Sequence, residues 1–216
     1  MTLIKLTNNT SEDVNTHITL GATEGCVQDV TTLVFSDPSI TVISEYPLKG
    51  YFVHKANTSV YVAAPDEMGF NGNVSFNTEP KNCKSHELPW GMNVAEFIVN
   101  NPFQAPYGQE TVDISCLAGA NALIKFKMDA TDWTTNGGAI TSIQEIVNGM
   151  WDQNTGLIGV FPYGCDNCTS SNNPPACVGL QPQFAQAEAI CNVQRPCDDN
   201  QGGVVEVILE GFFEIL

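Results

Sequence analysis

The chain has 216 residues, of which 43% are hydrophobic and only 15% charged, against roughly 25% charged in an average soluble domain. Neutral polar residues take the place of charge, with 20 Asn and 18 Thr, and this composition excludes a coiled coil, a disordered chain and an ordinary cytosolic helical bundle. A formal net charge of −16 repels phosphate backbones and anionic lipid, so nucleic acid is excluded and glycans, other neutral polymers or cations remain as partners. No apolar run reaches the roughly 18 residues of a membrane span.

Short segments with strand chemistry alternate with turn signals through the first 130 residues. They are residues 3–6, 17–20, 31–35, 40–43, 51–55, 59–64, 73–76, 95–99, 111–115 and 122–128. In the last segment, Lys125 and Lys127 alternate with apolar residues, which predicts one solvated face and one buried face. Many short strands with regular turns predict an all-β, two-sheet antiparallel sandwich.

Apolar positions of these alternating segments are expected to form the inner faces of the two sheets. The predicted core comprises Ile4, Leu6, Val34, Phe52, Val60, Phe97, Val99, Ile114, Phe126, Val205 and Val207.

The pattern of short strand-like segments separated by turns ends at about residue 138. Segment 140–151 has apolar residues at helical spacing, and Ser142 and Glu145 have the spacing of a capping box. Segment 182–194 starts with Pro182, a favourable first helical residue. Two short helices are therefore predicted, followed by a final strand at 204–209. We expect a single domain over 1–216, with residues 138–203 as a disulfide-rich, partly helical excursion.

Eight cysteines, an even number, favour disulfides in an oxidising compartment. The Cys165–Cys168 spacing also fits zinc or a redox pair, but zinc prefers a second close pair, and a redox pair prefers to open a helix after a strand. No metal or other cofactor is predicted. The predicted disulfide cysteines are Cys26, Cys83, Cys116, Cys165, Cys168, Cys177, Cys191 and Cys197.

Glycosylation sequons also favour an extracellular location. They start at Asn8, Asn9, Asn57, Asn73 and Asn167. The opening MTLIKLTNN lacks the features of a signal peptide, so we expect either that a leader has been removed or that another route is used.

Residues 93–126 carry an ordered set of non-trivial residues: Ala95, Glu96, Phe97, Asn100, Asp113, Ser115, Gly119, Asn121, Ile124 and Phe126. This stretch resembles the centre of the thaumatin-like (osmotin-like) family, and LIKLTNN resembles that family's first strand. The resemblance implies two packed antiparallel sheets and an acidic cleft associated with β-1,3-glucan binding, and in some relatives with hydrolysis. Thr10 stands where the family's first cysteine falls. Ala118 replaces the next cleft acid, and the single arginine, Arg195, lies too far along the chain to be the cleft arginine.

Glu96 and Asp113 are the candidate catalytic pair, because a glycosidase needs two carboxyls that face each other across the scissile bond. We expect them to approach each other on neighbouring strands, with the pKa of at least one raised by like-charge repulsion. The alternative is that both are ordinary residues of a solvated strand face.

Asp129, Asp132 and Trp133 are candidate ligand-binding residues, since they follow a strand and an aromatic ring can stack on a sugar. The alternative is an ordinary turn in which Asp is favoured by local hydrogen bonds.

Three functions stay open. The first is a secreted, carbohydrate-associated protein that binds β-glucan-type polysaccharide in an acidic cleft, with hydrolysis less expected than binding. The second is a structural or assembly subunit, such as an extracellular filament, coat or adhesin, in which copies of the chain pack through exposed strand edges. The third is a secreted domain with another partner.

Overall fold

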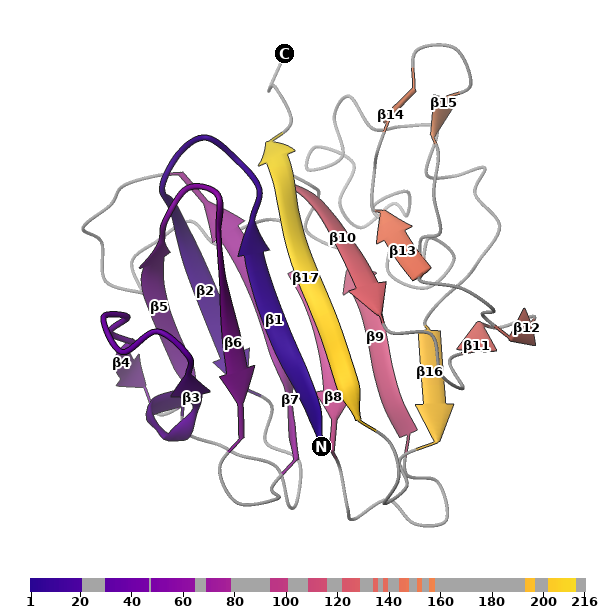
Figure 1. Ribbon diagram of the computed structural model, residues 1–216, viewed down its shortest axis with the longest axis horizontal. Coiled ribbons are helices and arrows are strands. Elements are labelled where there is room, and N and C mark those ends of the chain that lie inside the picture. Colours follow the sequence, from indigo (N-terminus) through magenta and orange to yellow (C-terminus); the bar gives the residue numbers. More distant parts are fainter. Residues whose placement is uncertain are drawn as a thin grey trace, which may run out of the picture.

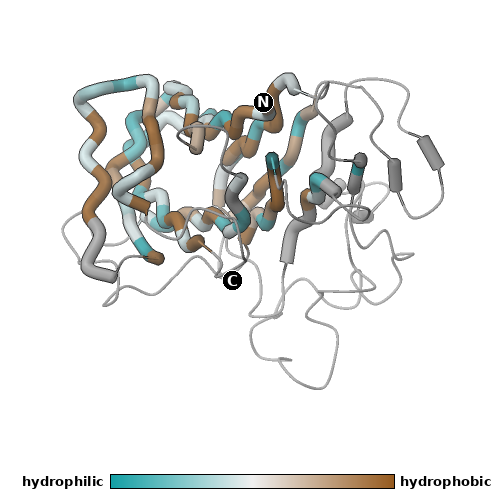
Figure 2. Tube along the Cα trace, turned by 90° about the horizontal axis from the view of Figure 1, so that it is seen from below, coloured by the Kyte–Doolittle hydropathy of each residue, from teal (hydrophilic) through white to brown (hydrophobic). Residues whose placement is uncertain are grey.

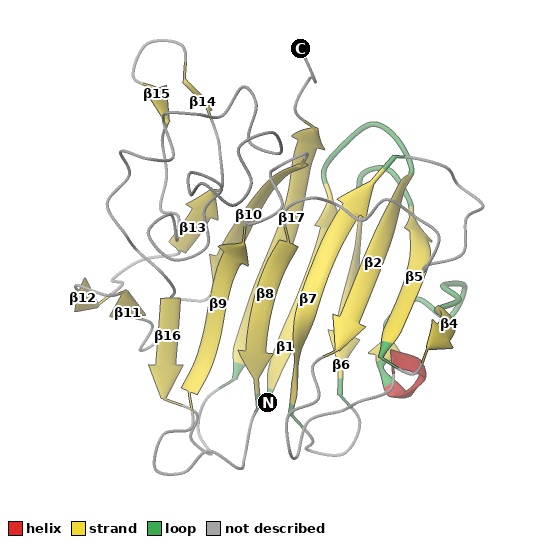
Figure 3. Ribbon diagram, turned by 180° about the vertical axis from the view of Figure 1, so that it is seen from behind, coloured by secondary structure: helices red, strands yellow, loops and turns green. Residues whose placement is uncertain are grey.

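Strands make up nearly all of the regular structure in the computed structural model (Figure 1). It describes residues 1–20, 30–46, 48–64, 69–78, 94–100, 109–115, 122–128 and 202–212, and short strands at 134–135, 138–139, 144–147, 151–152, 156–157 and 193–196. Two sheets lie face to face, one seen in front in Figure 1 and the other in front in Figure 3. The prediction of an all-β two-sheet sandwich is confirmed.

The first sheet has six strands. In spatial order they are β13 (Gln144–Val147), β10 (Ala122–Met128), β17 (Gly203–Phe212), β1 (Thr2–Asn8), β6 (Thr58–Ala63) and β3 (Val34–Phe35). β1 and β17 run parallel at its centre, with Ile4 opposite Val205, and the other described pairs are antiparallel. The sheet is therefore mixed, which corrects the expectation of purely antiparallel pairing.

The second sheet has nine strands and is entirely antiparallel among the described pairs. In spatial order they are β12 (Gly138–Ala139), β11 (Thr134–Thr135), β16 (Val193–Pro196), β9 (Gln109–Ser115), β8 (Val94–Val99), β7 (Phe70–Asn77), β2 (Val14–Leu20), β5 (Lys49–His54) and β4 (Ile43–Tyr46). A separate pair consists of β14 (Trp151–Asp152) and β15 (Gly156–Leu157).

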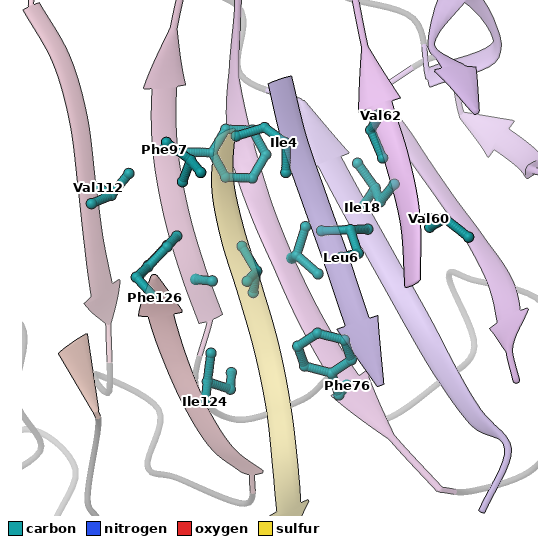
Figure 4. Packing of buried hydrophobic residues seen from close by; sticks show 14 of the residues in the cluster. Ile4, Leu6, Ile18, Val60, Val62, Phe76, Phe97, Val112, Ile124 and Phe126 are labelled. Carbon is teal, nitrogen blue, oxygen red and sulfur yellow. The ribbon is translucent and has the colours of Figure 1, made fainter. Parts of the chain in front are cut away.

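Residues alternate between buried and part-exposed along the central strands, because successive side chains of a strand point to opposite faces. Figure 2 shows this as alternating brown and teal along the chain. The inward side chains form one hydrophobic cluster between the sheets (Figure 4). Nine predicted core residues are buried: Ile4, Leu6, Phe52, Val60, Phe97, Val99, Phe126, Val205 and Val207.

Val34 is the exception, because 54% of it is exposed. The chain enters β3 from a 3₁₀ turn, η1 (Val30–Thr32), in which residues three apart share a face. Val30 and Leu33 are thereby buried together, and the strand continues with Phe35 inward and Val34 outward. The side chain of Ile114, the remaining predicted core residue, lies outside the described set.

The predicted helix over 140–151 is wrong where the structure describes it. Residues 144–147 form β13, which pairs antiparallel with β10 and places Glu145 opposite Lys127. Sheet pairing at a free strand edge overrides a short helical period. The predicted helix over 182–194 lies outside the described residues except at its end, where Val193 begins β16. η1 is the one helix in the described part of the chain, and no described helix is long and apolar enough to cross a membrane.

A row of residues with alternating charge, here called the charge row, crosses the six-stranded sheet at opposite strand positions: Lys5, Glu206, Lys127 and Glu145. The side chain of Glu145 lies outside the described set. Lys5 Nζ lies 2.8 Å from Glu206 Oε1, and Thr7 Oγ1 donates to the same oxygen at 2.6 Å. Burial alone would raise the pKa of Glu206, but the Lys5 and Thr7 hydrogen bonds and the charges of Lys5 and Lys127 hold this pKa below its usual value. The row stabilises the sheet, since opposite charges across strands attract.

A buried asparagine holds the C-terminal end of β1. Asn8 is fully buried, and its Nδ2 lies within hydrogen-bond distance of the carbonyl oxygens of Glu12, His54 and Lys55. Its Oδ1 accepts from the backbone N–H and the hydroxyl of Thr10. The side chain thereby ties β1 to the turn that follows it and to the end of β5.

A buried ion pair closes the other end of the sandwich. Arg195 Nε lies 2.6 Å from Glu110 Oε2, and both side chains are at most 2% exposed. The guanidinium also donates to Thr2 Oγ1 and to the Gly202 carbonyl, while the backbone N–H of Asn100 donates to Glu110 Oε1. A buried charge pair is tolerated when such hydrogen bonds satisfy its remaining atoms. Here they join β9 and β16 to the start of β1 in the opposite sheet.

Candidate functional site

Glu96 and Asp113 lie directly opposite each other on the neighbouring strands β8 and β9. Ala95, Phe97 and Val99 of β8 are buried in the core, so Glu96 faces outward, where it is half-buried. Opposite residues of an antiparallel pair share a face, with Cβ atoms about 4.5–5.5 Å apart. The prediction that the two acids lie on neighbouring strands is confirmed at the level of strand register. The side chain of Asp113 lies outside the described set, so the approach of the two carboxyls and their chemical role stay predictions.

The pairing continues sideways into a row of polar positions across five strands, here called the polar row: Lys49, Thr19, Asn73, Glu96 and Asp113. It crosses β5, β2, β7, β8 and β9, which lie side by side in Figure 3. With strands about 4.8 Å apart, its backbone positions span about 19 Å. The outer face of the nine-stranded sheet thus offers a line of ammonium, hydroxyl, amide and carboxylate residues perpendicular to the strands.

A cavity of about 320 Å³ lies over the middle of the polar row. Its polar lining comes from five residues: Thr19, Asn71, Asn73, Glu96 and Thr111. Leu20, Phe97 and Ile98 supply apolar walls, and Gly72 completes the lining. A Cβ at residue 72 would collide with the carbonyl oxygen of Thr19, so glycine is required for β7 to lie this close to β2.

His17 lies on the same outer face, yet it is only 1% exposed. It is opposite Tyr51 on one side and Ser75 on the other, and its ring stacks on Tyr51 with centroids 5.7 Å apart. Burial lowers the pKa of His17 to about 4, so the ring is neutral at pH 7. This burial was not predictable, because Asn15, His17 and Thr19 alternate in the sequence with other residues as they would on a solvated strand face.

Arg195 is absent from this face. Val193 pairs with the core residue Val112, so Arg195, two residues further along β16, points to the inner side of the sheet. The expectation that Arg195 is no cleft arginine is consistent with its position in the closing ion pair. The buried ion pair of Glu110 and Arg195 was not predicted. The signal for it in the sequence was the presence of one arginine in a strongly acidic chain.

The other predicted site residues lie outside the described residues. These are Asp129, Asp132, Trp133 and the eight cysteines, together with Ala118. Within the described ranges, no group of three or more His, Cys, Asp or Glu residues is arranged to hold a metal ion.

The sequons differ in accessibility. Asn8 is fully buried, and a glycan on its Nδ2 would break the contacts that hold β1. Asn9 is exposed and donates to Glu210, and Asn57 is exposed in the turn before β6 with a φ of 54°. Asn73 is half-buried in the polar row. Asn57 is therefore the sequon least tied to the fold, and Asn167 lies outside the described residues.

The fold and the pairing of the strands place the chain in the class of all-β two-sheet sandwiches. Among solved structures it matches the protein elicitor MoHrip2 from Magnaporthe oryzae over 97% of this chain and 98% of that chain, at 9% identity and a TM-score of 0.38. A likeness at that level does not establish a shared fold. No protein-family model and no curated protein sequence matches the chain.

Proposed function

We propose that this protein is a secreted, carbohydrate-associated protein that binds β-glucan-type polysaccharide along the polar row. The observation that carries the proposal is the cavity over that row, where Thr19, Asn71, Asn73, Glu96 and Thr111 converge. Binding sites for small ligands combine apolar walls with a few placed polar groups, and this lining has both.

The chemistry of the row suits a neutral chain of hydroxyl groups. Asparagine side chains both donate and accept, threonine hydroxyls do the same, and the Glu96 carboxylate accepts strongly from hydroxyls. A net charge of −16 repels anionic polymers and leaves an uncharged sugar polymer unaffected. A span of about 19 Å across five strands accommodates several sugar units lying perpendicular to the strands.

The thaumatin-like resemblance supports the same ligand, since Glu96 and Asp113 match two acids of that family's cleft. Two departures favour binding over hydrolysis. Ala118 removes an acid that would tune the pair, and Arg195 is committed to Glu110 inside the sandwich. We therefore propose a lectin-like role, with β-1,3-glucan as the first ligand to test.

Calorimetric titration with laminarin, a β-1,3-glucan, tests the proposal. Glu96→Gln and Asp113→Asn are expected to weaken binding about tenfold or more, because each removes a charged hydrogen-bond acceptor. Glu12→Gln is the matched control, since Glu12 is exposed and lies off the row. Absence of binding by the wild-type protein would refute the proposal. A reducing-sugar assay on the same polymer detects hydrolysis, which we expect to be absent.

The extracellular assignment is tested by the oxidation state of the cysteines. Closing loops with disulfides contributes about 2–4 kcal/mol each, and most of the eight cysteines are expected to be oxidised. Mass spectrometry of protein alkylated with and without prior reduction counts them. Finding mostly free thiols would end the extracellular proposal.

A structural or assembly subunit, such as an extracellular filament, coat or adhesin, is the second candidate function. It is favoured by the edge strands β3 and β4, near which Val34, Ile43 and Tyr61 are exposed apolar residues. These strands lie on the side of the sandwich away from β9 and β16 (Figure 1).

A further inference from the structure

The turn that joins β5 to β6 begins a glycosylation sequon, Asn57-Thr58-Ser59. Figure 1 shows this turn beside the turn that joins β1 to β2, at one end of the sandwich. The backbone N–H of Asn57 donates to the Thr10 carbonyl at 3.1 Å, which ties the two turns together. The asparagine of this sequon therefore lies on a supported turn rather than inside a sheet.

All three residues of the sequon are exposed. A glycan is bulky, so a folded chain accommodates one only where the acceptor asparagine faces solvent. Asn57 has a φ of 54°, in the left-handed region that asparagine visits more readily than most other residues. That conformation alone accounts for an asparagine, so the surroundings of the side chain decide whether a glycan fits.

Hydrogen bonds hold the turn without using the side-chain amide of Asn57. The Thr58 hydroxyl donates to the Lys55 carbonyl at 2.7 Å. The Asp13 carboxylate accepts from the Ala56 N–H at 3.0 Å and from the Lys55 ammonium at 2.7 Å. Within the described part of the chain, no hydrogen bond involves the side chain of Asn57. A sugar on its amide nitrogen would therefore leave the described contacts of the turn intact.

The other described sequons are less suited to a glycan. Asn8 Nδ2 lies within hydrogen-bond distance of three backbone carbonyl oxygens in the interior. Asn9 Nδ2 donates to a carboxylate oxygen at 2.7 Å. Asn73 is half-buried in the polar row, and Ser75, the hydroxyl residue of its sequon, is only 1% exposed. Among the described sequons, the one at Asn57 combines an exposed asparagine, an exposed hydroxyl residue and an amide that supports no described contact.

We infer that Asn57 carries an N-linked glycan and that Asn8 does not. In this modification, Nδ2 of Asn57 attacks the anomeric carbon of an oligosaccharide carried on a lipid pyrophosphate. The bond from Nδ2 to the anomeric carbon forms as the bond from that carbon to the pyrophosphate oxygen breaks. The lipid pyrophosphate leaves, and Nδ2 loses one proton. The inference rests on the extracellular part of the proposed function, because sequons are modified in secreted proteins.

The glycan would lie away from the polar row. Lys49 is the first residue of β5 and belongs to the row, whereas Asn57 follows the last residue of that strand, His54. The five steps from Lys49 to His54 cover about 17 Å along the strand. Glucan binding is therefore expected to be the same with and without a glycan on Asn57.

Production of the chain behind a cleavable leader in a eukaryotic secretion host tests the inference. Enzymatic release of N-linked glycans in heavy-oxygen water converts each occupied asparagine into a labelled aspartate, which mass spectrometry locates. Chymotrypsin cleaves after Tyr61 and so separates Asn57 from Asn73. Label is expected at residue 57 and not at residue 8.

Two substitutions of one hydroxyl residue provide a matched pair. Ser59→Ala destroys the sequon and leaves Asn57 in place, whereas Ser59→Thr keeps the sequon. Label at residue 57 is expected to be lost in the first variant and retained in the second. Ser59 Oγ lies 2.8 Å from the Thr7 hydroxyl on the exposed surface, so both variants are expected to fold. Asn57→Asp removes the acceptor amide with a residue that tolerates the same φ, and it is expected to lose the glycan as well.

Circular dichroism and the melting temperature show whether each variant folds. An unmodified Asn57 in the secreted wild-type protein overturns the inference, and so does label at residue 8 of the folded protein or label at residue 57 of Ser59→Ala. Thiol counting and laminarin titration of the same preparation test the proposed function separately. Oxidised cysteines with an unmodified Asn57 refute the glycan alone, whereas an occupied Asn57 without glucan binding refutes the binding proposal alone.

Discussion

The two outer faces of the sandwich arrange charge in opposite ways. The charge row on the six-stranded sheet alternates lysine and glutamate, and the Glu206 carboxylate forms an ion pair of 2.8 Å with Lys5. The polar row on the nine-stranded sheet instead places Glu96 directly opposite Asp113. Like charges at opposite positions tend to destabilise a sheet, so we expect the polar row to stabilise the fold less than the charge row does.

The single arginine of the sequence lies on neither outer face, because it is buried between the two sheets. Arg195 compensates Glu110 between the sheets, so its guanidinium is buried on the inner side of the nine-stranded sheet, away from the polar row. The guanidinium of Arg195 therefore stabilises the end of the sandwich where it pairs with Glu110. Stability measurements on charge variants distinguish charges that support the fold from charges at the candidate site.

Arg195→Met is expected to have the largest effect on the free energy of unfolding. It leaves Glu110 buried and uncompensated, which should lower the free energy of unfolding by about 3–5 kcal/mol, measured by urea denaturation. Replacing both partners, Arg195→Met with Glu110→Leu, is expected to recover most of the loss, because no buried charge remains. A single-variant loss below about 1 kcal/mol would contradict a structural role for the pair.

The pKa of His17 reports whether the outer face beside the polar row excludes water as the interior does. Burial lowers the pKa of His17 to about 4, and burial lowers the pKa of the interior His54 to about 4 as well, although the hydrogen bond to the Thr58 carbonyl partly opposes the shift. Since the unfolded chain then binds more protons between pH 6.5 and 4, stability falls as the pH falls through that window, by about 3 kcal/mol per histidine.

Nuclear magnetic resonance titration of the ring protons measures each pKa, and urea denaturation at pH 7 and pH 4.5 measures the linked loss. His17→Gln is expected to remove roughly half of the pH dependence that the two histidines share. The lowered pKa values of Glu206 and Glu210 act in a separate window, below their usual value of 4.5. A His17 ring that titrates near 6.5 would show a solvated outer face.

Glu206→Gln, a change in the charge row, is expected to have a smaller effect on the free energy of unfolding. It removes the ion pair with Lys5, which is partly exposed, so the free energy of unfolding at pH 7 should fall by about 0.5–1 kcal/mol. Because the folded pKa of Glu206 is depressed, the wild-type advantage should disappear as the pH falls through that pKa. An effect that persists at strongly acidic pH would show that packing, rather than charge, explains it.

Glu96→Gln makes the same chemical change in the polar row and is expected to have the smallest effect, with the opposite sign. Removing one of two opposed acids should raise the free energy of unfolding by a few tenths of a kcal/mol. Urea denaturation beside Glu206→Gln, under identical conditions, compares the two rows directly. A loss of stability equal to that of Glu206→Gln would mean that Glu96 supports the fold.

The strands were predictable where alternation was strong and local. β1, β8 and β10 follow their patterns residue by residue, and the opposed positions of Glu96 and Asp113 follow from two such strands joined by a short connection. Val34 was misplaced because one 3₁₀ turn shifts which residues face inward, and the turn has no distinctive sequence pattern. Segment 144–147 was misassigned because pairing with β10 decides its structure.

The site could be predicted only in part for a similar reason. The acids of the polar row lie on strands with clear alternation, but Thr19, Asn71 and Thr111 join them through strand pairing between segments far apart in the chain. The parallel contact of β1 with β17 and the Arg195–Glu110 pair likewise join distant residues. Contacts of that kind leave no periodic signal in one sequence.

Backbone amide shifts during titration with a β-1,3-glucan oligosaccharide test the central claim most directly, because they report on both outer faces and the interior at once. The account predicts shifts along the polar row, at Thr19, Asn73 and Glu96, with Lys5 and Glu206 of the charge row unchanged. Shifts confined to the charge row, or no shifts at saturating oligosaccharide, would contradict it.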